Sequence, residues 1–217
     1  MTANCLSSTK RGVNVSIMMR VFVFLAAIVL GTVVGPVSAL WASGLVGTER
    51  PMSFADVEIN GWLSDWAVGS EAADPYLRAR IARHGLLAMR KEGAVYFARN
   101  TDDSGHPLTD KCRYRLSGGD QKAYWWSITL YDEDSMLPLN DDDALSFDAS
   151  DVPDGGPWEA MIASTQPTDR ANWVSSRAAG NFDLTLRLYR PDKQVLIDPE
   201  ATLNPPSVVR IDCEDER

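Results

Sequence analysis

Two stretches of the chain alternate between apolar and mixed positions with a period of two. Residues 124–132 place one apolar set opposite one mixed set: Trp126, Ile128 and Leu130 against Trp125, Ser127, Thr129 and Tyr131. Residues 182–189 do the same: Phe182, Leu184, Leu186 and Leu188 against Asp183, Thr185, Arg187 and Tyr189. This period, in a run rich in aromatic and β-branched residues, is typical of strands with one buried face. We therefore predict that both stretches are central strands of one β-sandwich.

Shorter runs predict the rest of the domain. Further strands are expected at residues 94–98, 112–116, 158–164 and 208–213. Asp74-Pro75 supplies an N-cap oxygen and a proline at the first helical position, which predicts an amphipathic helix over residues 75–92, ending before Gly93. Residues 43–60 are interpreted as a linker. The fold is thus expected to be mainly β, with an antiparallel β-sandwich domain over residues 61–217 that includes the helix.

The N-terminal part of the chain is strongly apolar. Residues 21–40 carry no charged side chain and are long enough to cross a membrane once as a helix, so we predict a transmembrane anchor over residues 21–42. Lys10, Arg11 and Arg20 precede it, and the positive-inside rule then places residues 1–20 in the cytoplasm. In a bacterium, this arrangement is a single pass of the inner membrane with a periplasmic C-terminal domain.

A cleavable signal peptide is the alternative to the anchor. Val37-Ser38-Ala39 resembles a small-residue cleavage site, and Pro36 stands directly before it. The apolar run is longer than a usual signal core, and Trp41 suits a membrane interface, which favours the anchor. Both interpretations export the domain. Met18 or Met19 is an alternative start of translation.

Cysteine usage agrees with export. Cys5 precedes the apolar segment, which leaves Cys112 and Cys213 as the two cysteines of the domain. Two lone thiols in an oxidising compartment predict a disulfide, which would join the last strand to an early one. The alternative is a pair of buried free thiols.

The charges of the chain are unevenly distributed. Residues 1–42 contain three basic and no acidic residues, so of the net charge of -9 they carry +3 and the remaining residues -12. A domain this acidic is repelled by phosphate, which argues against a nucleic-acid partner. One side of the predicted helix carries a stripe of basic residues: Arg80, Arg83, Arg90 and Lys91. Such a stripe could bind anionic lipid or an anionic polymer, but it is more often a face that is exposed to solvent.

Acidic residues gather in the second half of the chain. Residues 132–169 contain no lysine or arginine and many aspartates, including Asp141, Asp142 and Asp143. Clustered carboxylates on loops suit Ca²⁺, but three adjacent aspartates do not match the ligand spacing of an EF-hand loop. We interpret the segment as a solvated acidic rim, with Ca²⁺ as the alternative. No other metal or cofactor is expected.

Motifs for catalysis are missing. The chain has no His-x-x-x-His or Cys-x-x-Cys pair, no Gly-x-Ser-x-Gly elbow and no phosphate-binding glycine loop. His84 and His106 are interpreted as a helix-face and a loop residue. Paired carboxylates could act as acid and base on a sugar, and the residues to consider for that are Asp132, Asp183, Arg187 and Asn172. An envelope hydrolase or lyase is therefore the alternative to a non-catalytic protein.

Several longer motifs occur in a specific order. They are D-P-Y-L-R-A-R-I-A-R-H-G-L-L-A-M, E-G-A-V-Y-F-A-R-N-T-D-D-S-G-H-P-L, C-R-Y-R-L-S-G-G-D, W-W-S-I-T-L-Y-D, A-N-W-V and F-D-L-T-L-R-L-Y-R-P. In this order they resemble the domain-of-unknown-function 1214 family over about residues 60–213. The resemblance implies a jelly-roll-like β-sandwich preceded by a helix, and it implies no catalytic residues.

The resemblance is to the short, membrane-anchored members of the family. Longer relatives carry a preceding domain of unknown function, 1254, that does not occur in this sequence. The sequence also has Asn172-Trp173-Val174-Ser175 where the family is expected to have asparagine-tryptophan-leucine-proline. A turn fixed by proline is therefore not expected at this point.

These observations favour a membrane-tethered binding or structural module of the cell envelope. Its partner would be a glycan, a lipid head group or an envelope protein, and a sheet edge that seals an oligomer is a further alternative. The candidate ligand-facing residues are Trp125, Tyr131, Asn172, Trp173, Arg187 and Tyr189. Aromatic side chains at such positions either stack on a sugar or pack against a second layer.

Overall fold

The computed structural model describes residues 9–42, 56–83, 89–152, 155–168 and 172–214. It contains two units, one up to Glu49 and one from Arg50 to Arg217. The first consists of helix α1, Thr9–Ala42. Within α1, Ile17–Trp41 is long and apolar enough to cross a membrane, and its side chains are exposed in the structure. The predicted apolar helix is therefore a candidate membrane span. A signal sequence near the N-terminus has the same length and hydropathy.

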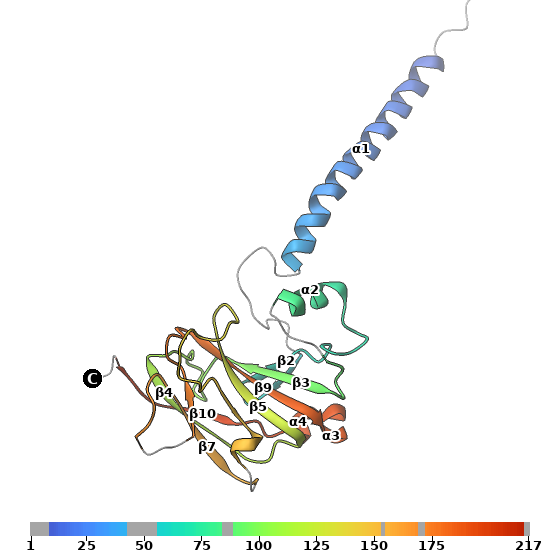
Figure 1. Ribbon diagram of the computed structural model, residues 1–217. Helices are drawn as coiled ribbons and strands as arrows, with labels where there is room; N and C mark the ends of the chain where they lie inside the picture. The colour runs from blue at the N-terminus through green and yellow to red at the C-terminus, as the bar shows by residue number, and fades with distance from the viewer. Residues whose placement is uncertain (1–8, 43–55, 84–88, 153–154, 169–171, 215–217) are drawn as a thin grey trace, which may run out of the picture. The chain divides into compact units, whose positions relative to one another are not determined.

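The second unit is mainly β, as predicted (Figure 1). Its strands are β1 Val57–Ile59, β2 Trp62–Ser64, β3 Ala94–Arg99, β4 Cys112–Gly118, β5 Ala123–Asp132, β6 Ser146–Asp148, β7 Trp158–Ala163, β8 Trp173–Ser175, β9 Phe182–Pro191 and β10 Ser207–Cys213. Its helices are α2 Pro75–Arg83, the 3-10 turn η1 Ala149–Asp151, α3 Lys193–Ile197 and α4 Pro199–Thr202.

The strands form two sheets. One has six strands in the order β1-β2-β3-β9-β5-β6, and the other has four in the order β10-β4-β7-β8. The two long strands predicted as central, β5 and β9, pair with each other in antiparallel register from Ala123↔Pro191 to Asp132↔Phe182. They lie inside the six-stranded sheet and run side by side in Figure 1. Neighbouring strands are antiparallel except β7 and β8, which are parallel, so the smaller sheet is mixed.

The apolar faces of the two sheets share one core. Side chains at alternate positions of β5 and β9 are buried with those of β4 and β7, including Ile128, Leu184, Leu186, Leu116 and Ile162, each 0% exposed. Aromatic rings cross between the layers: Trp126 stacks on Trp158 at 4.9 Å, and Tyr114 meets Phe182 edge-on at 5.9 Å. Each fully buried leucine or isoleucine stabilises the fold by about 1.5–3 kcal/mol.

The disulfide prediction is confirmed. Cys112 in β4 and Cys213 in β10 are directly opposite each other in the antiparallel pair, with their sulfur atoms bonded at 2.00 Å. The bond closes a segment of 101 residues. It therefore joins the last strand to an early one, as the sequence suggests.

The structure differs from the sequence expectations in two of the elements before β3. Helix α2 ends at Arg83, residues 84–88 (with His84) lie outside the described residues, and residues 89–92 are not helical. The predicted helix over 75–92 was thus too long, and Arg90 and Lys91 do not continue a helical stripe. Lys91 instead places its ammonium group 4.4 Å from the centre of the Trp66 ring. The predicted linker over 43–60 was wrong at its end, because Val57–Ile59 forms β1 and pairs with β2.

Candidate functional site

The outer face of the six-stranded sheet carries most of the candidate residues. Because β5 and β9 are in register, Trp125 is opposite Tyr189, Thr129 is opposite Thr185 and Tyr131 is opposite Asp183. These positions alternate with the core residues and so point away from the second sheet. We call the following side chains the outer cluster: Trp125, Thr129, Tyr131, Asp183, Arg187 and Tyr189. It includes four of the six predicted ligand-facing residues.

Arg187 is held in place by two hydroxyl groups of the neighbouring strand. Its guanidinium donates to Thr129 Oγ1 at 2.9 Å and to Tyr131 Oη at 2.5 Å. The same group lies over the Tyr131 ring, 5.3 Å from its centre. A partly buried arginine with these contacts loses little further conformational entropy when it binds a ligand. The outer cluster thus presents a preoriented set of hydrogen-bonding groups.

Trp125 and Tyr189 form an aromatic pair beside Arg187. Their ring centres are 5.2 Å apart, and the planes are tilted by 53°. The indole N–H of Trp125 donates to Ser150 Oγ at 3.2 Å, which fixes the orientation of the ring. Both residues are partly exposed, so their rings are not fully buried by a further layer of side chains. The Trp125 ring is therefore accessible for stacking on a sugar.

Asp183 is the titratable member of the outer cluster. Burial in the sheet face raises the pKa of its carboxyl group to about 7. The hydrogen bond with Thr185 and the charge of Arg187 act against this rise, whereas the carboxylate of Asp132 adds to it. A carboxyl group with this pKa changes its charge near neutral pH, and such groups are enriched at functional sites. Asp183 and Arg187, which sequence reasoning paired as residues to consider, do lie on one face.

We expect Asp183→Asn to remove a pH dependence of stability. The pKa of Asp183 is about 7 in the folded state and about 4 in the unfolded state, so the folded state holds the extra proton between these values. The contribution of Asp183 to the free energy of unfolding is therefore fully present below about pH 4 and is lost as the pH rises to about 7. Urea unfolding from pH 4 to pH 8 should show wild-type stability falling relative to Asp183→Asn. A constant difference between the two proteins would contradict the raised pKa.

Asn172 and Trp173 lie elsewhere. They are at the start of β8, at the edge of the four-stranded sheet. The Asn172 amide donates to the carbonyl oxygen of Glu159 at 3.0 Å, and the Trp173 indole donates to that of Ala163, also at 3.0 Å. Both side chains thus tie β8 to β7. The structure does not bring these two candidates to the outer cluster.

The remaining acidic candidates are engaged in loops. Asp132 Oδ1 accepts the backbone N–H groups of Asp134 at 3.0 Å and Met136 at 2.8 Å, so it caps the turn after β5. Asp141 and Asp142 both bond to Arg177, which lowers the pKa of each carboxyl group. Arg177 thus forms ion pairs with two of the three adjacent aspartates that were considered as Ca²⁺ ligands. Among the described residues, no group of three or more His, Cys, Asp or Glu side chains is placed to hold a metal ion.

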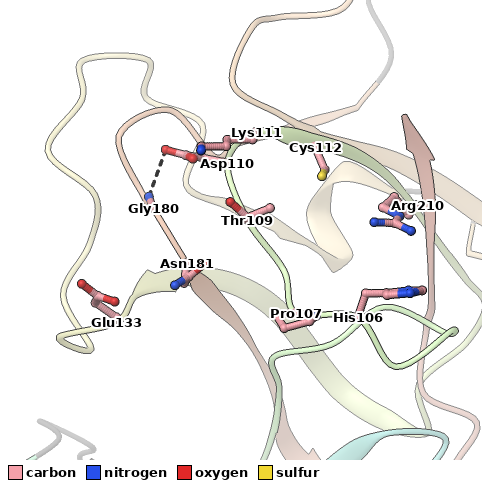
Figure 2. A pocket seen from close by; sticks show the side chains of 10 residues that line it. All are labelled: His106, Pro107, Thr109, Asp110, Lys111, Cys112, Glu133, Gly180, Asn181 and Arg210. Carbon is pink, nitrogen blue, oxygen red and sulfur yellow. Dashed lines mark hydrogen bonds between the residues drawn. The ribbon is translucent and has the colours of Figure 1, made fainter. Parts of the chain in front are cut away.

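A cavity at one end of the sandwich was not foreseen. It has a volume of about 600 Å³, and its walls come from four separate segments of the chain: His106–Cys112 (except Leu108), Glu133, Gly180–Asn181 and Arg210 (Figure 2). No local pattern marks these residues, since they meet only through long-range strand pairing. The predicted Cys112–Cys213 bridge was the one usable signal, because it brings β10, and with it Arg210, beside β4.

Comparison with known proteins supports the family expectation. Residues 93–193 match the sequence model of the family described as "Protein of unknown function (DUF1214)". No curated protein matches the chain.

Solved structures match the chain, and the one with a TM-score above 0.5 resembles it in fold. One is the crystal structure of the VPA0106 protein from Vibrio parahaemolyticus, with a TM-score of 0.51 and 18% identity, over 63% of this chain and 35% of that one. Another is a putative uncharacterized protein from Burkholderia cenocepacia, with a TM-score of 0.38 and 20% identity, over 82% of this chain and 41% of that one. The chain thus spans well under half the length of either protein. The match over residues 93–193 agrees with the resemblance of the sequence motifs to the DUF1214 family.

Proposed function

We propose that the chain is a membrane-tethered binding module of the cell envelope, whose outer cluster binds a neutral glycan. The observation that carries this proposal is the arrangement of the Trp125–Tyr189 ring pair next to a preoriented Arg187 on one partly exposed sheet face. Aromatic rings pack against the apolar faces of sugars, while their polar ends and neighbouring donors bond to hydroxyl groups. A rigid set of such groups binds at a low entropic cost.

The charge of the domain favours a neutral ligand. The part of the chain after residue 42 carries a net charge of -12, which raises the energy of a polyanion near its surface. The net charge of -12 already includes Arg187, so this single guanidinium does not offset the excess. A glycan without carboxylates or phosphates meets no such repulsion.

The N-terminal helix and the disulfide support a location in the cell envelope. Three basic residues precede the apolar core of α1, which favours a cytoplasmic N-terminus and an exported second unit. The Cys112–Cys213 bond suits an oxidising compartment. In a bacterium with two membranes, the domain would lie in the periplasm, tethered to the inner membrane.

Acid catalysis on the bound glycan is the second candidate function. It is favoured by the burial of Asp183 in the sheet face, which raises its pKa to about 7 and leaves a protonated carboxyl group available as a general acid near neutral pH. Asp132 would be the second carboxylate of a pair. Prolonged incubation of chitohexaose with the wild type and with Asp183→Asn tests this candidate by chromatography of the products. Cleavage by the wild type alone supports it, and intact chitohexaose in both samples contradicts it.

We expect Trp125→Ala to weaken glycan binding by at least about tenfold, which corresponds to about 1.4 kcal/mol. Calorimetry of the full chain in mild detergent with chitohexaose measures the effect, and circular dichroism checks the fold. Trp173→Ala is the matched control, since it removes a partly exposed tryptophan from the other sheet. Equal affinity of Trp125→Ala and wild type, or a greater loss in Trp173→Ala, would contradict binding at the outer cluster.

A further inference from the structure

The cavity at the end of the sandwich is separate from the outer cluster. None of the six outer-cluster residues lines it. It is an open hollow with a volume of about 600 Å³, which is large enough to hold a small molecule. It lies beside the disulfide, because Cys112 is one of its lining residues. A ligand in this cavity would therefore touch parts of the domain that the disulfide holds together.

One wall of the cavity carries the side chains of Arg210 and His106 and is organised by a buried carboxylate. Asp102 is 3% exposed, and its Oδ1 accepts the backbone N–H groups of Ser104 at 2.8 Å and His106 at 2.9 Å. The imidazole of His106 lies 3.4 Å from Oδ1, and Arg210 Nε lies 3.6 Å from Oδ2. Asp102 thus stands between two side chains that line the cavity, and Figure 2 shows them next to each other.

The Asp102 carboxylate is ionised and incompletely paired. Burial raises the pKa of Asp102, but the hydrogen bonds from the backbone of His106 and Ser104, together with the His106 imidazole, outweigh this effect and leave the pKa below its ordinary value. Oδ2 is buried and accepts no hydrogen bond from the described residues, although Arg210 is near. The negative charge therefore keeps the Arg210 guanidinium at the cavity wall, where its remaining N–H groups can reach a ligand.

The opposite side of the cavity carries two acidic groups, Glu133 and Asp110, and the side chain of Lys111 beside Asp110. Figure 2 shows Glu133 across the cavity from Arg210, with Asp110 along the upper edge. Asp110 is oriented by the backbone N–H of Gly180, which donates to its Oδ2 at 3.0 Å. Glu133 is exposed at the turn after β5. The amide group of Asn181 stands between the charged sides as a neutral donor and acceptor.

We propose that this cavity binds a small zwitterion, with its carboxylate on Arg210 and His106 and its ammonium group on Glu133 and Asp110. Arginine recognises a carboxylate through paired N–H donors, and carboxylates are the natural partners of an ammonium group. A zwitterion has no net charge, so the excess of -12 on this part of the chain does not repel it. A free amino acid and the two ends of a short peptide share this chemistry.

Calorimetry of the full chain in mild detergent tests the proposal with chemically matched probes. These are alanine, alanyl-alanine, N-acetyl-alanyl-alanine without the ammonium group, and alanyl-alanine amide without the carboxylate. We expect one of the two zwitterions to bind at least about tenfold more tightly than both blocked dipeptides. Tighter binding of alanine identifies the free amino acid as the source, and tighter binding of alanyl-alanine identifies the peptide. Equal affinity for blocked and unblocked dipeptides, or no heat with either zwitterion, overturns the proposal.

Variants of the two walls give a second, independent test. Glu133→Gln should weaken the zwitterion at least about fivefold and leave N-acetyl-alanyl-alanine unchanged, whereas Arg210→Gln should weaken both. Arg115→Gln on the exposed side of β4 is the matched control for the loss of an arginine, and Trp125→Ala should leave alanyl-alanine binding unchanged. Thermal melts check that each variant is folded. If Arg210→Gln is unstable, Glu133→Gln alone tests whether the cavity binds the zwitterion as proposed. An equal loss of both probes in Glu133→Gln overturns the assignment of the ammonium group.

Discussion

Replacing Cys112 and Cys213 together by alanine is expected to lower the free energy of unfolding by about 4–5 kcal/mol. The bond closes a segment of 101 residues, so its removal restores a large conformational entropy to the unfolded chain. It also releases β10, which pairs with β4 at the edge of the four-stranded sheet. Urea unfolding of the full chain in detergent, followed by tryptophan fluorescence, measures the loss.

The matched control for this double substitution is Cys5→Ser, which removes the third cysteine and leaves the bridge intact. Its unfolding curve should coincide with that of the wild type. Incubation of the wild type with a reducing agent should reproduce the effect of the double variant. A double variant within about 1 kcal/mol of the wild type would show that the cross-link contributes little, and the entropic argument would then fail.

Trp126→Ala is expected to destabilise the domain by about 3–5 kcal/mol. The Trp126 side chain is 6% exposed and stacks on Trp158 from the other sheet, with ring centres 4.9 Å apart. Its ring also lies beside that of Phe147, with ring centres 5.8 Å apart. Truncation to alanine leaves a cavity where the two sheets meet, and the surrounding rings cannot close it without leaving their rotamers.

Trp125→Ala is the control for this truncation, because it removes the same side chain from the next residue of the same strand. Its ring lies on the outer face, so the expected cost is about 1–2 kcal/mol, from the contact with Tyr189 and the bond to Ser150. Chemical unfolding of the two variants side by side gives the comparison. If Trp125→Ala were the more damaging of the two, the assignment of inner and outer faces would be wrong.

The long strands could be predicted because their sequence alternation is strong and local. β5 and β9 each place apolar residues at every second position, and this pattern fixes which face is buried wherever one sheet face is covered. The disulfide could be predicted from the number of cysteines outside the apolar segment. The alternation thus predicts β5 and β9 as central strands, and the disulfide joins β10 to β4.

The short elements could not be predicted in the same way. β1, β2 and β8 have three residues each, which is too few for a periodic pattern to stand out. β2 is stabilised by a distant contact, the bond from the Trp62 indole to the carbonyl oxygen of Pro206 at 2.7 Å. The helix prediction failed at its C-terminal end because residues 89–92 are helix-compatible in composition but turn back towards β3.

The candidate site was predictable in part. Trp125, Tyr131, Arg187 and Tyr189 come together because the β5–β9 register is set by their own buried neighbours. Asn172 and Trp173, the other two candidate ligand-facing residues, lie apart from this group, and nothing in three residues of sequence indicates that β8 is at the edge of the other sheet. The end cavity depends on four distant segments, and its charge pattern emerges only from the tertiary structure.

The most direct test of the proposed outer-cluster site is an NMR titration of the full chain, ¹⁵N-labelled on its seven tryptophan indoles, with chitohexaose in mild detergent. Substitution of single tryptophans by phenylalanine assigns the signals. We expect the Trp125 indole signal to shift most, while the signals of the buried Trp62, Trp126 and Trp158 stay in place. A saturating titration in which Trp173 moves and Trp125 does not, or in which no signal moves, would contradict it.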